Sequence, residues 1–456
     1  MSSAAQQTAV AAGAEAAVEP AAADRAAVVD AVLERGPVGL PPWLRRACWL
    51  LAGLGLAALA VGLLAGEAAW TVTALLVASL VVAGAAQVGV IWSAVFEMTN
   101  ARWGRSYRRL AELSLAAAPV ALLGLLVLLV SAPWWVPFAD MHLPGGKGVW
   151  LSLPFWALRN GLAVLGLFLL SLVYLRHCLR PDLGLAARRG KAFSGWLAAR
   201  CGRDFGDPDA EIARAARQRK RLAPVLCLAY AFVYSMVGFD LVMALDVWWY
   251  STLFGAYHFT GNVYLGLALL ILLAVVLRHR LGQPRFFSAK HFGIAGAMLF
   301  AFCFLMGDFF WSQFLTIHYA DLPEEAGWVI QRTMDPELPY APLAWAVLAG
   351  FFGIPFLALL FRAVKWVPRR LAAVALVVVL AMIAERFLTA APPLLALEPG
   401  AAAWRMWLPL GLSLIAALGA LGAGALLLDR LMRQVPLLPI TDPLLLASLE
   451  DEEERP

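Results

Sequence analysis

Charged residues are scarce in this sequence. Only 15% of its 456 residues are Asp, Glu, Lys or Arg, whereas 62% are hydrophobic, and the mean hydropathy is +0.75. Soluble domains carry about a quarter charged residues, so this shortage excludes an ordinary soluble globular protein. The apolar residues lie in long blocks, which favours one helical membrane domain over the roughly three soluble domains that the length alone would suggest.

Cysteine is also rare, and its spacing excludes the common thiolate sites. The sequence has no C-x-x-C or C-x-x-C-H spacing of the kind that holds iron–sulfur clusters, zinc or covalent haem. We therefore expect this chain to bind no metal and no redox cofactor of its own. The net charge of +5 reflects arginines that flank apolar runs, so it does not indicate binding to nucleic acid. The five cysteines are Cys48, Cys178, Cys201, Cys227 and Cys303.

The first 40 residues lack the continuous apolar core of a signal peptide. They are rich in alanine, but seven charged residues interrupt the segment between Glu15 and Arg35. A cleavable signal needs an uninterrupted apolar region. We therefore expect residues 1–44 to form a cytoplasmic tail, with a short amphipathic helix at residues 22–35 that lies on the membrane or on a partner.

Ten apolar runs are long enough to cross a bilayer. A membrane-spanning helix needs about 20 mostly apolar residues, and its backbone groups must be hydrogen-bonded within the segment. The sequence therefore predicts an all-α, polytopic membrane protein. The predicted spans are residues 47–65, 70–96, 110–132, 150–175, 222–245, 260–277, 291–318, 341–364, 371–390 and 404–428.

The segments between these runs alternate in positive charge, and this sets the orientation because Lys and Arg resist translocation. Residues 176–221 carry twelve Lys or Arg, whereas the segments on the opposite side carry only Lys147 and Arg332. Both termini are therefore expected in the cytoplasm. The basic loop at 176–221 either anchors the chain to anionic lipid or docks another subunit. The expected order is helices one to four at 45–175, the basic loop at 176–221, helices five to ten at 222–428 and a tail at 429–456.

Ionisable residues within the predicted spans are the strongest functional signal. Such groups are costly in hydrocarbon, so they usually face the bundle interior, pair with each other or line a proton path. In the predicted topology most of them lie in the outer half of the membrane, which suits exchange of protons with the outer compartment. The candidates for a proton path are Glu97, Arg159, Asp240, Asp246, Asp308 and Glu385.

Several of these residues have structural alternatives. Arg159 can form a buried ion pair with Asp240 or with Asp308 and so fix helix register. Glu97 lies near the cytoplasmic headgroups, where it can be a surface acid or can line the mouth of an inner half-channel.

Residues of the outer half have structural alternatives as well. Asp246, His258 and His318 can lie in the wet interface. Glu385 and Arg386 are adjacent, so on a helix they point about 100° apart and are not expected to pair.

Three segments resemble a known family. They are GFDLVMALDVWWYSTLFG at residues 238–255, GDFFWSQFLTIHYADLPEEAGWVIQR at 307–332 and PLLPITDPLLLASLEDEEE at 436–454. Over roughly residues 45–450, their order resembles the NrfD-like (polysulfide reductase membrane subunit) family, and within it the membrane subunits of bacterial alternative complex III. The resemblance implies a bacterial inner membrane protein whose helices two to five and six to nine form two four-helix bundles, flanked by helices one and ten.

The resemblance also implies a reaction and partners. Such complexes oxidise quinol and pass electrons through iron–sulfur and haem c subunits to cytochrome c or to an oxidase. The expected partners are the sister NrfD-like subunit ActC, the iron–sulfur subunit ActB, the multihaem cytochrome c ActA, membrane lipid and a terminal oxidase. The residues expected at a quinol site are Asp308, Gln313, His318 and His258.

One position departs from the family pattern. Family members often have a Pro-His pair before the tryptophan that follows helix five, where this chain has Val247 and Trp248. Loss of an imidazole removes a natural proton acceptor and hydrogen-bond partner for quinol. We therefore expect a structural and proton-translocating subunit with no assigned catalytic residue. The alternatives are a quinol-binding subunit of the same complex and a secondary transporter with a midplane site.

Overall fold

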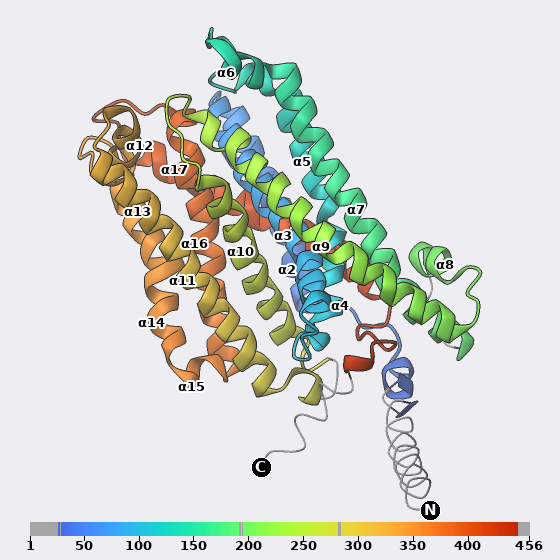
Figure 1. Cartoon of the computed structure of the whole chain (residues 1–456). Helices are drawn as coiled ribbons and strands as arrows, with labels where there is room; N and C mark the ends of the chain where they lie inside the picture. Colours follow the sequence, from blue (N-terminus) through green and yellow to red (C-terminus); the bar gives the residue numbers. More distant parts are fainter. Residues whose placement is uncertain (1–25, 28, 191–192, 194, 281–283, 446–456) are drawn as a thin grey trace, which may run out of the picture.

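Ten helical spans account for most of the chain. The computed structural model describes residues 26–27, 29–190, 193, 195–280 and 284–445, and within these ranges it contains helices and no strand (Figure 1). Ten segments there are long and apolar enough to cross a membrane, which confirms the predicted all-α polytopic fold. They are α2 (Pro42–Leu64), α3 (Ala68–Met98), α4 to α5 (Arg105–Val130), α7 (Leu153–Arg188), α9 (Pro208–Leu241), α10 (Phe254–Leu277), α11 (Ala289–Ala320), α13 to α14 (Ala341–Leu360), α16 (Pro368–Leu395) and α17 (Trp404–Met432).

Shorter elements connect the spans or interrupt them. They are η1 (Ser114–Ala117), η2 (Ala132–Trp134), α6 (Gly145–Trp150), α8 (Trp196–Gly202), η3 (Met243–Leu245), η4 (Pro284–Phe287), α12 (Pro323–Thr333), η5 (Ala349–Gly353) and α15 (Arg362–Lys365). Of these, α12 and the π-helical turn η5 matter most for the site described below.

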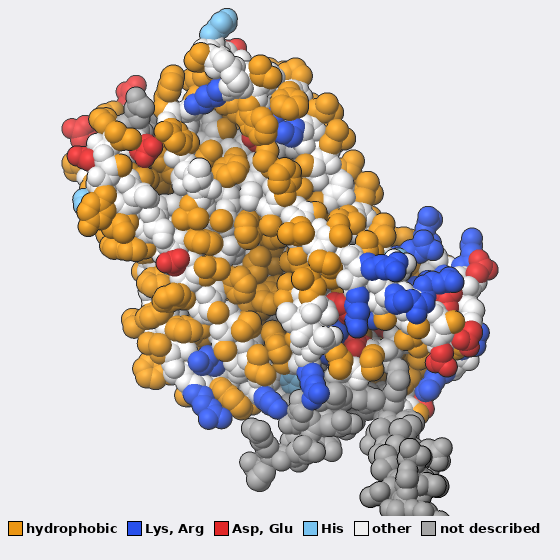
Figure 2. All heavy atoms as spheres, viewed as in Figure 1, with side chains coloured by type: hydrophobic (Ala, Val, Ile, Leu, Met, Phe, Trp, Pro, Cys, Tyr) orange, Lys and Arg blue, Asp and Glu red, His pale blue; other side chains and the backbone are white. Residues whose placement is uncertain are grey.

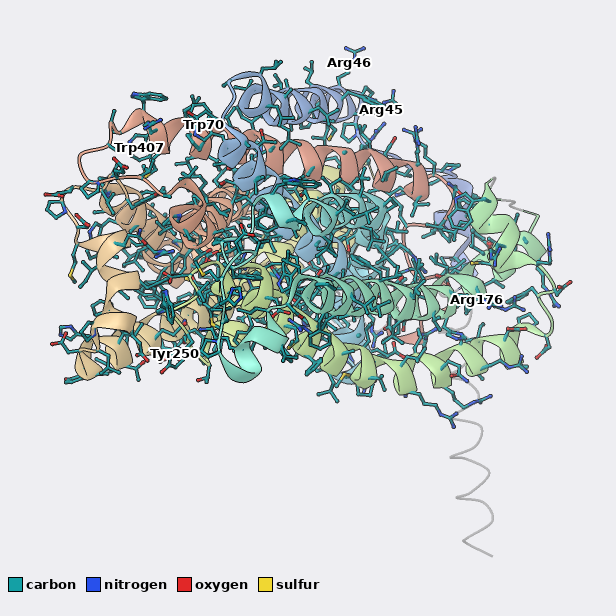
Figure 3. The ribbon with its side chains drawn as sticks, turned by 90° about the horizontal axis from the view of Figure 1, so that it is seen from above. Arg45, Arg46, Trp70, Arg176, Tyr250 and Trp407 are labelled. Carbon is teal, nitrogen blue, oxygen red and sulfur yellow. The ribbon has the colours of Figure 1, made fainter. Side chains whose placement is uncertain are left out.

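The two ends of the helical body differ in composition. Figure 2 shows hydrophobic side chains over the middle, Lys and Arg mostly toward the lower end, and a group of acidic side chains at the upper left. The positive-inside rule predicts that the end rich in arginine faces the cytoplasm. We call the two ends the basic end, marked by Arg45, Arg46 and Arg176, and the aromatic end, marked by Trp70, Trp407 and Tyr250 (Figure 3).

The spans form two four-helix bundles and one flanking pair. The first bundle contains α3, α4–α5, α7 and α9, and the second contains α10, α11, α13–α14 and α16. The bundles meet where α3 and α9 contact α10 and where α3 contacts α16. α2 packs along α17, and an added side-chain carbon at Gly55 would lie 2.8 Å from the Cα of Gly419. Glycines allow this close approach of two membrane helices.

Helices α7 and α9 continue well into the predicted basic loop. α7 ends at Arg188, and α9 begins at Pro208, so only a short connection with α8 remains between them. Asp207 caps α9 by accepting a hydrogen bond from Ala210 N at 2.9 Å, and Pro208 follows it at the first helical position, where its missing N–H has no cost. The basic residues therefore lie largely on helical extensions rather than on a long loop.

Segments near both termini pack on the basic end. Val29 and Leu33 are buried against Ala186 and Ile440, so the amphipathic segment expected on the membrane or on a partner covers this chain itself. Residues 435–445, which we call the C-terminal strap, fold back under the body and bury Leu438 and other apolar side chains. Of the expected tails at 1–44 and 429–456, residues 1–25, 28 and 446–456 lie outside the described residues.

Candidate functional site

Helix α4 is polar and yet buried at the basic end. All nine of its residues are buried, although its three arginines are predicted to lie in a loop. Arg108 Nη1 lies 2.9 Å from Glu97 Oε2 and 2.6 Å from Asp442 Oδ2, and Arg108 Nε lies 2.9 Å from Glu112 Oε1. The interpretation of these arginines as flanking loop charges is wrong, because the protein surrounds them and neutralises them.

The buried charges at this end balance each other. Each of the eight side chains involved is at most 8% exposed, and four arginines face four carboxylates. Buried charges persist in proteins when they are paired, so this balance makes the burial tolerable. Glu97 belongs to this set and is therefore not a surface acid. The members of this basic-end network are Arg105, Arg108, Arg109, Arg219, Glu97, Glu112, Asp182 and Asp442.

The C-terminal strap completes the basic-end network. Asp442 Oδ2 accepts from Arg105 Nη1 at 2.9 Å and from Arg108 Nη1 at 2.6 Å. The amide and hydroxyl of Thr441 both donate to Asp182 Oδ1, at 2.9 Å and 2.5 Å. Burial raises the pKa of Asp442, but Arg108 and Arg105 outweigh it and hold the pKa below its ordinary value. Ion pairs and hydrogen bonds therefore hold the strap in place, in addition to the packing of its apolar residues.

Asp240 is saturated with donors at the aromatic end of the first bundle. Its Oδ2 accepts from Arg159 Nη2 at 2.7 Å and from Asn160 Nδ2 at 2.8 Å, and its Oδ1 accepts from Trp150 Nε1 at 3.1 Å. The guanidinium of Arg159 also lies 3.8 Å from the centre of the Trp150 ring. Of the two expected partners of Arg159, the structure selects Asp240. With a counter-charge and three donor groups, this carboxylate is a structural anchor between α7 and α9.

Arg332, on α12, satisfies two backbone carbonyls inside the second bundle. Its Nε donates to Leu388 O at 3.1 Å, and its Nη2 donates to Thr389 O at 3.3 Å. Pro392 and Pro393 stand four residues later in α16 and have no N–H for these two carbonyls. The guanidinium replaces the missing donors, as helix-breaking prolines in membrane helices require. Burial lowers the pKa of Arg332 to about 9, although the nearby Asp246 acts against this shift.

A second polar cluster lies in the middle of the second bundle and is incompletely hydrogen-bonded. Arg386 Nη1 lies 3.1 Å from Glu385 Oε2, so these neighbours do pair, against expectation, because the long arginine side chain turns back along α16. Arg386 Nη2 donates to His258 O at 3.0 Å and to Asn262 Oδ1 at 3.2 Å. Both carboxylate oxygens of Glu385 and both ring nitrogens of His258 nevertheless have no hydrogen-bond partner.

These unpartnered atoms are deeply buried. Glu385 and Arg386 are each 1% exposed, and His258 is fully enclosed, which excludes the wet-interface alternative for His258. Buried polar atoms without a partner are rare in native proteins, and ordered water is the usual partner that completes such a site.

A cavity of about 520 Å³ opens beside this cluster. It lies among α10, α11, α12, α13, η5 and α16, and aromatic side chains are the largest group in its wall. Three predicted candidates, Asp308, Gln313 and Glu385, line it together. The π-helical turn η5 contributes Phe351 and Phe352 to the wall, and such turns occur frequently at functional sites.

The structure thus separates the predicted site residues into distinct places. Arg159 and Asp240 bind each other in the first bundle, and Glu97 is at the basic end. His318 is exposed and stacks on Phe314, with 5.7 Å between ring centres, and it does not line the cavity. His258 contacts Arg386 through its carbonyl rather than facing the cavity.

Some important residues have little or no signal in the sequence. There, Arg332 is only one of two positive charges on the outer side, although the Pro392-Pro393 pair signals a helix that needs outside donors. Tyr257, which also lines the cavity, lies on α10 before the apolar run predicted at 260–277, so the sequence gives it no signal. The network role of Asp442 has no local signal, because its partner Arg108 is 334 residues away.

In the part of the chain that the structure describes, no group of three or more His, Cys, Asp or Glu side chains could hold a metal ion. All five cysteines are free thiols. No family model matches this sequence, and no curated protein matches it either. The chain is an integral membrane protein with ten apolar helices, and its functional assignment depends on its own residues and on the resemblance described above.

Proposed function

We propose that this chain is the ActF-type subunit of an alternative complex III, an NrfD-like membrane subunit that anchors the complex and carries part of a proton path. The resemblance at residues 238–255, 307–332 and 436–454 supports the family. The arrangement of two four-helix bundles with two flanking helices agrees with it. In this proposal quinol oxidation, the iron–sulfur clusters and the haems belong to ActC, ActB and ActA, and this chain contributes no redox centre.

The proposed proton path is supported mainly by the environment of the Glu385 carboxyl group. This carboxyl group is buried and lines a cavity of the second bundle. Arg386 pairs with it at 3.1 Å and Tyr257 interacts with it, but its two oxygens lack the set of well-formed hydrogen bonds that holds Asp240. A carboxyl group in such a site can take up and release a proton when water reaches it, whereas the oxygens of Asp240 are occupied by Arg159, Asn160 and Trp150. Glu385 is therefore the residue that we assign to proton transfer.

Polar side chains lead from Glu385 toward the first bundle. Arg386 contacts Asn262, and Asn262 lies against Gly84 of α3, where an added side-chain carbon would be 2.7 Å from Asn262 Oδ1. Further along α3, Gln87 donates to Ser171 Oγ at 2.6 Å, and Ser93 donates to Glu112 of the basic-end network at 2.8 Å. Gly84, Gln87 and Ser93 follow one another at intervals of about 4 to 9 Å along the axis of α3. Water must therefore bridge the polar side chains of this series.

The test is Glu385→Gln in the intact complex, reconstituted in proteoliposomes. We expect proton transfer coupled to quinol oxidation to slow by roughly tenfold or more, because a positioned acid–base group contributes at least that much. Assembly and quinol oxidation measured with the membrane uncoupled should persist. Glu398→Gln, an exposed carboxylate beyond the end of α16, is the matched control. An unchanged number of protons moved per electron in Glu385→Gln would remove this residue from the path.

A further inference from the structure

The exposed side of α9 changes in character along one stripe. Side chains spaced by three or four residues lie on the same face of a helix. On this face, three side chains within the span are apolar and 53% to 74% exposed, and three nearer the start of α9 are exposed arginines. The members of the stripe, in order, are Arg214, Arg217, Arg221, Val225, Leu228 and Phe232. The surface of α9 therefore changes from basic to apolar between Arg221 and Val225.

The exposed side of α7 changes in the same way. Leu169 and Leu172 are apolar and about half exposed, and the exposed Arg176 follows on the same face (Figure 3). Arg219 Nη1 donates to His177 O at 3.3 Å, so these parts of α9 and α7 lie side by side. The change between apolar and basic surface therefore occurs at the same level on both helices.

The apolar part of α7 matches the thickness of a bilayer. Residues 153–173 extend over about 30 Å, which is the usual thickness of the hydrocarbon core. Beyond this level α7 continues for about 20 Å to Arg188, and with α8 and the start of α9 it forms an extension at the basic end. Figure 2 shows Lys and Arg on this extension, at the right, directly beside hydrophobic surface. The exposed cations therefore begin where phospholipid headgroups are expected.

Four exposed cations at this level lack a counter-charge in the chain. In the part of the chain that the structure describes, none of them forms an ion pair, whereas the buried Arg219 pairs with Glu97 in the basic-end network. The sequence of α9 contains no Asp or Glu between Glu211 and Asp240. Uncompensated cations that lie close together attract anions. These four residues, which we call the basic face, are Arg176, Arg217, Lys220 and Arg221.

The exposed acids of the extension lie away from the basic face. Asp207 and Asp209 are at the start of α9, and Asp209 is about 12 Å from Arg217 along the helix axis. On α8, which packs against α7, Trp196 is 64% exposed. An exposed tryptophan beside arginines is typical of a segment that lies at the membrane–water interface.

Arg180 holds the extension together. Its Nε and Nη2 donate to the two carboxylate oxygens of Glu211, each at 3.0 Å, and so join α7 to α9. Its Nη1 and Nη2 also donate to Arg203 O and Asp204 O, each at 3.0 Å, in the connection that follows α8. Such bidentate pairing of arginine with a carboxylate fixes geometry as well as adding stability. The basic face is therefore presented by a preorganised surface, and a ligand needs to order little of it.

We infer that the basic face binds the phosphate groups of anionic phospholipids in the leaflet at the basic end, and that this contact sets the depth of α7 and α9 in the bilayer. Arginine and lysine bind phosphate through charge-assisted hydrogen bonds, and clusters of them beside membrane helices attract anionic lipid. Of the two occupants that the sequence allows for residues 176–221, lipid is favoured over another subunit, because the basic face continues the lipid-facing stripes of two spans. The inference concerns the first bundle and does not depend on the proton path proposed for the second.

The experiment uses the intact complex in liposomes that contain equal amounts of phosphatidylglycerol and phosphatidylcholine. Each lipid is supplied in turn with a diazirine in its headgroup, and mass spectrometry measures labelling of residues 176–221. We expect phosphatidylglycerol to label this segment roughly fivefold or more above phosphatidylcholine, and high salt to reduce the ratio. Equal labelling by the two lipids would overturn the inference. Protection of the segment from both lipids would also overturn it, because another subunit would then cover the basic face.

Paired substitutions locate the binding on the basic face. Arg217→Gln with Arg221→Gln removes two of its charges, and we expect the preference for phosphatidylglycerol to fall by roughly fivefold or more. Arg217→Lys with Arg221→Lys is the matched control, which keeps both charges and should keep the preference.

A second pair of substitutions covers the case in which the first variant does not assemble. Arg176→Gln with Lys220→Gln removes the other two charges of the basic face, on α7 and α9, and should lower the preference in the same way. A preference for phosphatidylglycerol that is the same in the glutamine variants and in the lysine control would contradict the assignment of the basic face.

Discussion

Two carboxylates within the spans, Asp240 and Glu385, differ in what surrounds them. Asp240 accepts from Arg159, Asn160 and Trp150, whereas Glu385 has Arg386 as its ion-pair partner at 3.1 Å and lacks such a set of well-formed hydrogen bonds. In the sequence both are single acids within apolar runs, so hydropathy predicts that each is important but not which one is an anchor. The difference arises from side chains contributed by other helices, and no local pattern encodes it.

Asp240→Asn should therefore affect stability rather than proton transfer. The substitution leaves the guanidinium of Arg159 without its counter-charge in a site where Arg159 is only 13% exposed. We expect a loss of about 3 kcal/mol, as for other broken buried ion pairs, seen as a lower thermal midpoint of the purified complex. The protons moved per electron in the assembled fraction should stay the same. Asp321→Asn, an exposed residue at the end of α11, is the control and should change neither quantity.

The contribution of the Arg332 contact with α16 to stability can be tested by a double-mutant cycle. Arg332→Ala leaves the carbonyls of Leu388 and Thr389 unsatisfied, which should cost about 2 kcal/mol or more of unfolding free energy. In a Pro392→Ala, Pro393→Ala background the new N–H groups can bond to those carbonyls, so Arg332→Ala should cost much less there. Equal costs in the two backgrounds would show that Arg332 acts through some other contact.

At the scale of elements, hydropathy predicts where helices cross lipid but not where they end. The ten apolar runs correspond to the ten observed spans, because lipid requires continuous apolar helices. The polar ends of α7 and α9 were predicted as loop, since a helix outside lipid needs no apolar run. Helix α4 differs from its sequence-based prediction for another reason: its arginines are buried by ion pairs with the distant residues Asp182 and Asp442, so its composition is that of a loop.

The C-terminal strap should detach when its acid is removed. Asp442→Asn leaves Arg105 and Arg108 short of one counter-charge inside the protein. We expect faster amide hydrogen exchange throughout residues 435–445 and a loss of about 3 kcal/mol from the basic end. Glu337→Gln, an exposed acid at the aromatic end, is the control and should leave exchange in the strap unchanged. Unaltered exchange in Asp442→Asn would mean that apolar contacts alone hold the strap.

The pKa of Asp442 gives this contact a defined pH dependence. Because Arg108 and Arg105 lower the pKa in the folded chain, the contribution of Asp442 is fully present above the ordinary pKa of an aspartate, about 3.9. It is lost only as the pH falls through the lower pKa of the folded state. Exchange in the strap should therefore be flat between about pH 8 and pH 5, once corrected for the intrinsic rate. A rise within that interval would contradict the assignment.

At the scale of the whole molecule, the two bundles differ in how completely the carboxylate at the aromatic end is bound. In the first bundle the aromatic-end acid is saturated, and at the basic end eight charges neutralise one another. In the second bundle Glu385 and His258 keep free hydrogen-bonding capacity, and the cavity lies beside Glu385. Function is therefore expected in the second bundle, with the first acting as its rigid support. This asymmetry arises from side-chain contacts between helices. The apolar spans of the two halves are similar in sequence, so the asymmetry cannot be predicted from them.

The direction of any proton path depends on which end faces the cytoplasm. The positive-inside rule places the basic end there, even though three arginines of α4 are neutralised within the protein, because Arg45, Arg46 and Arg176 remain at that end (Figure 3). In spheroplasts a membrane-impermeant maleimide should label Glu337→Cys at the aromatic end and spare Asp209→Cys in the first turn of α9. After the membrane is opened, both should react, which controls for local accessibility. Labelling of Asp209→Cys in intact spheroplasts would show that the chain has the opposite orientation in the membrane. Glu385 would then exchange protons with the cytoplasm instead.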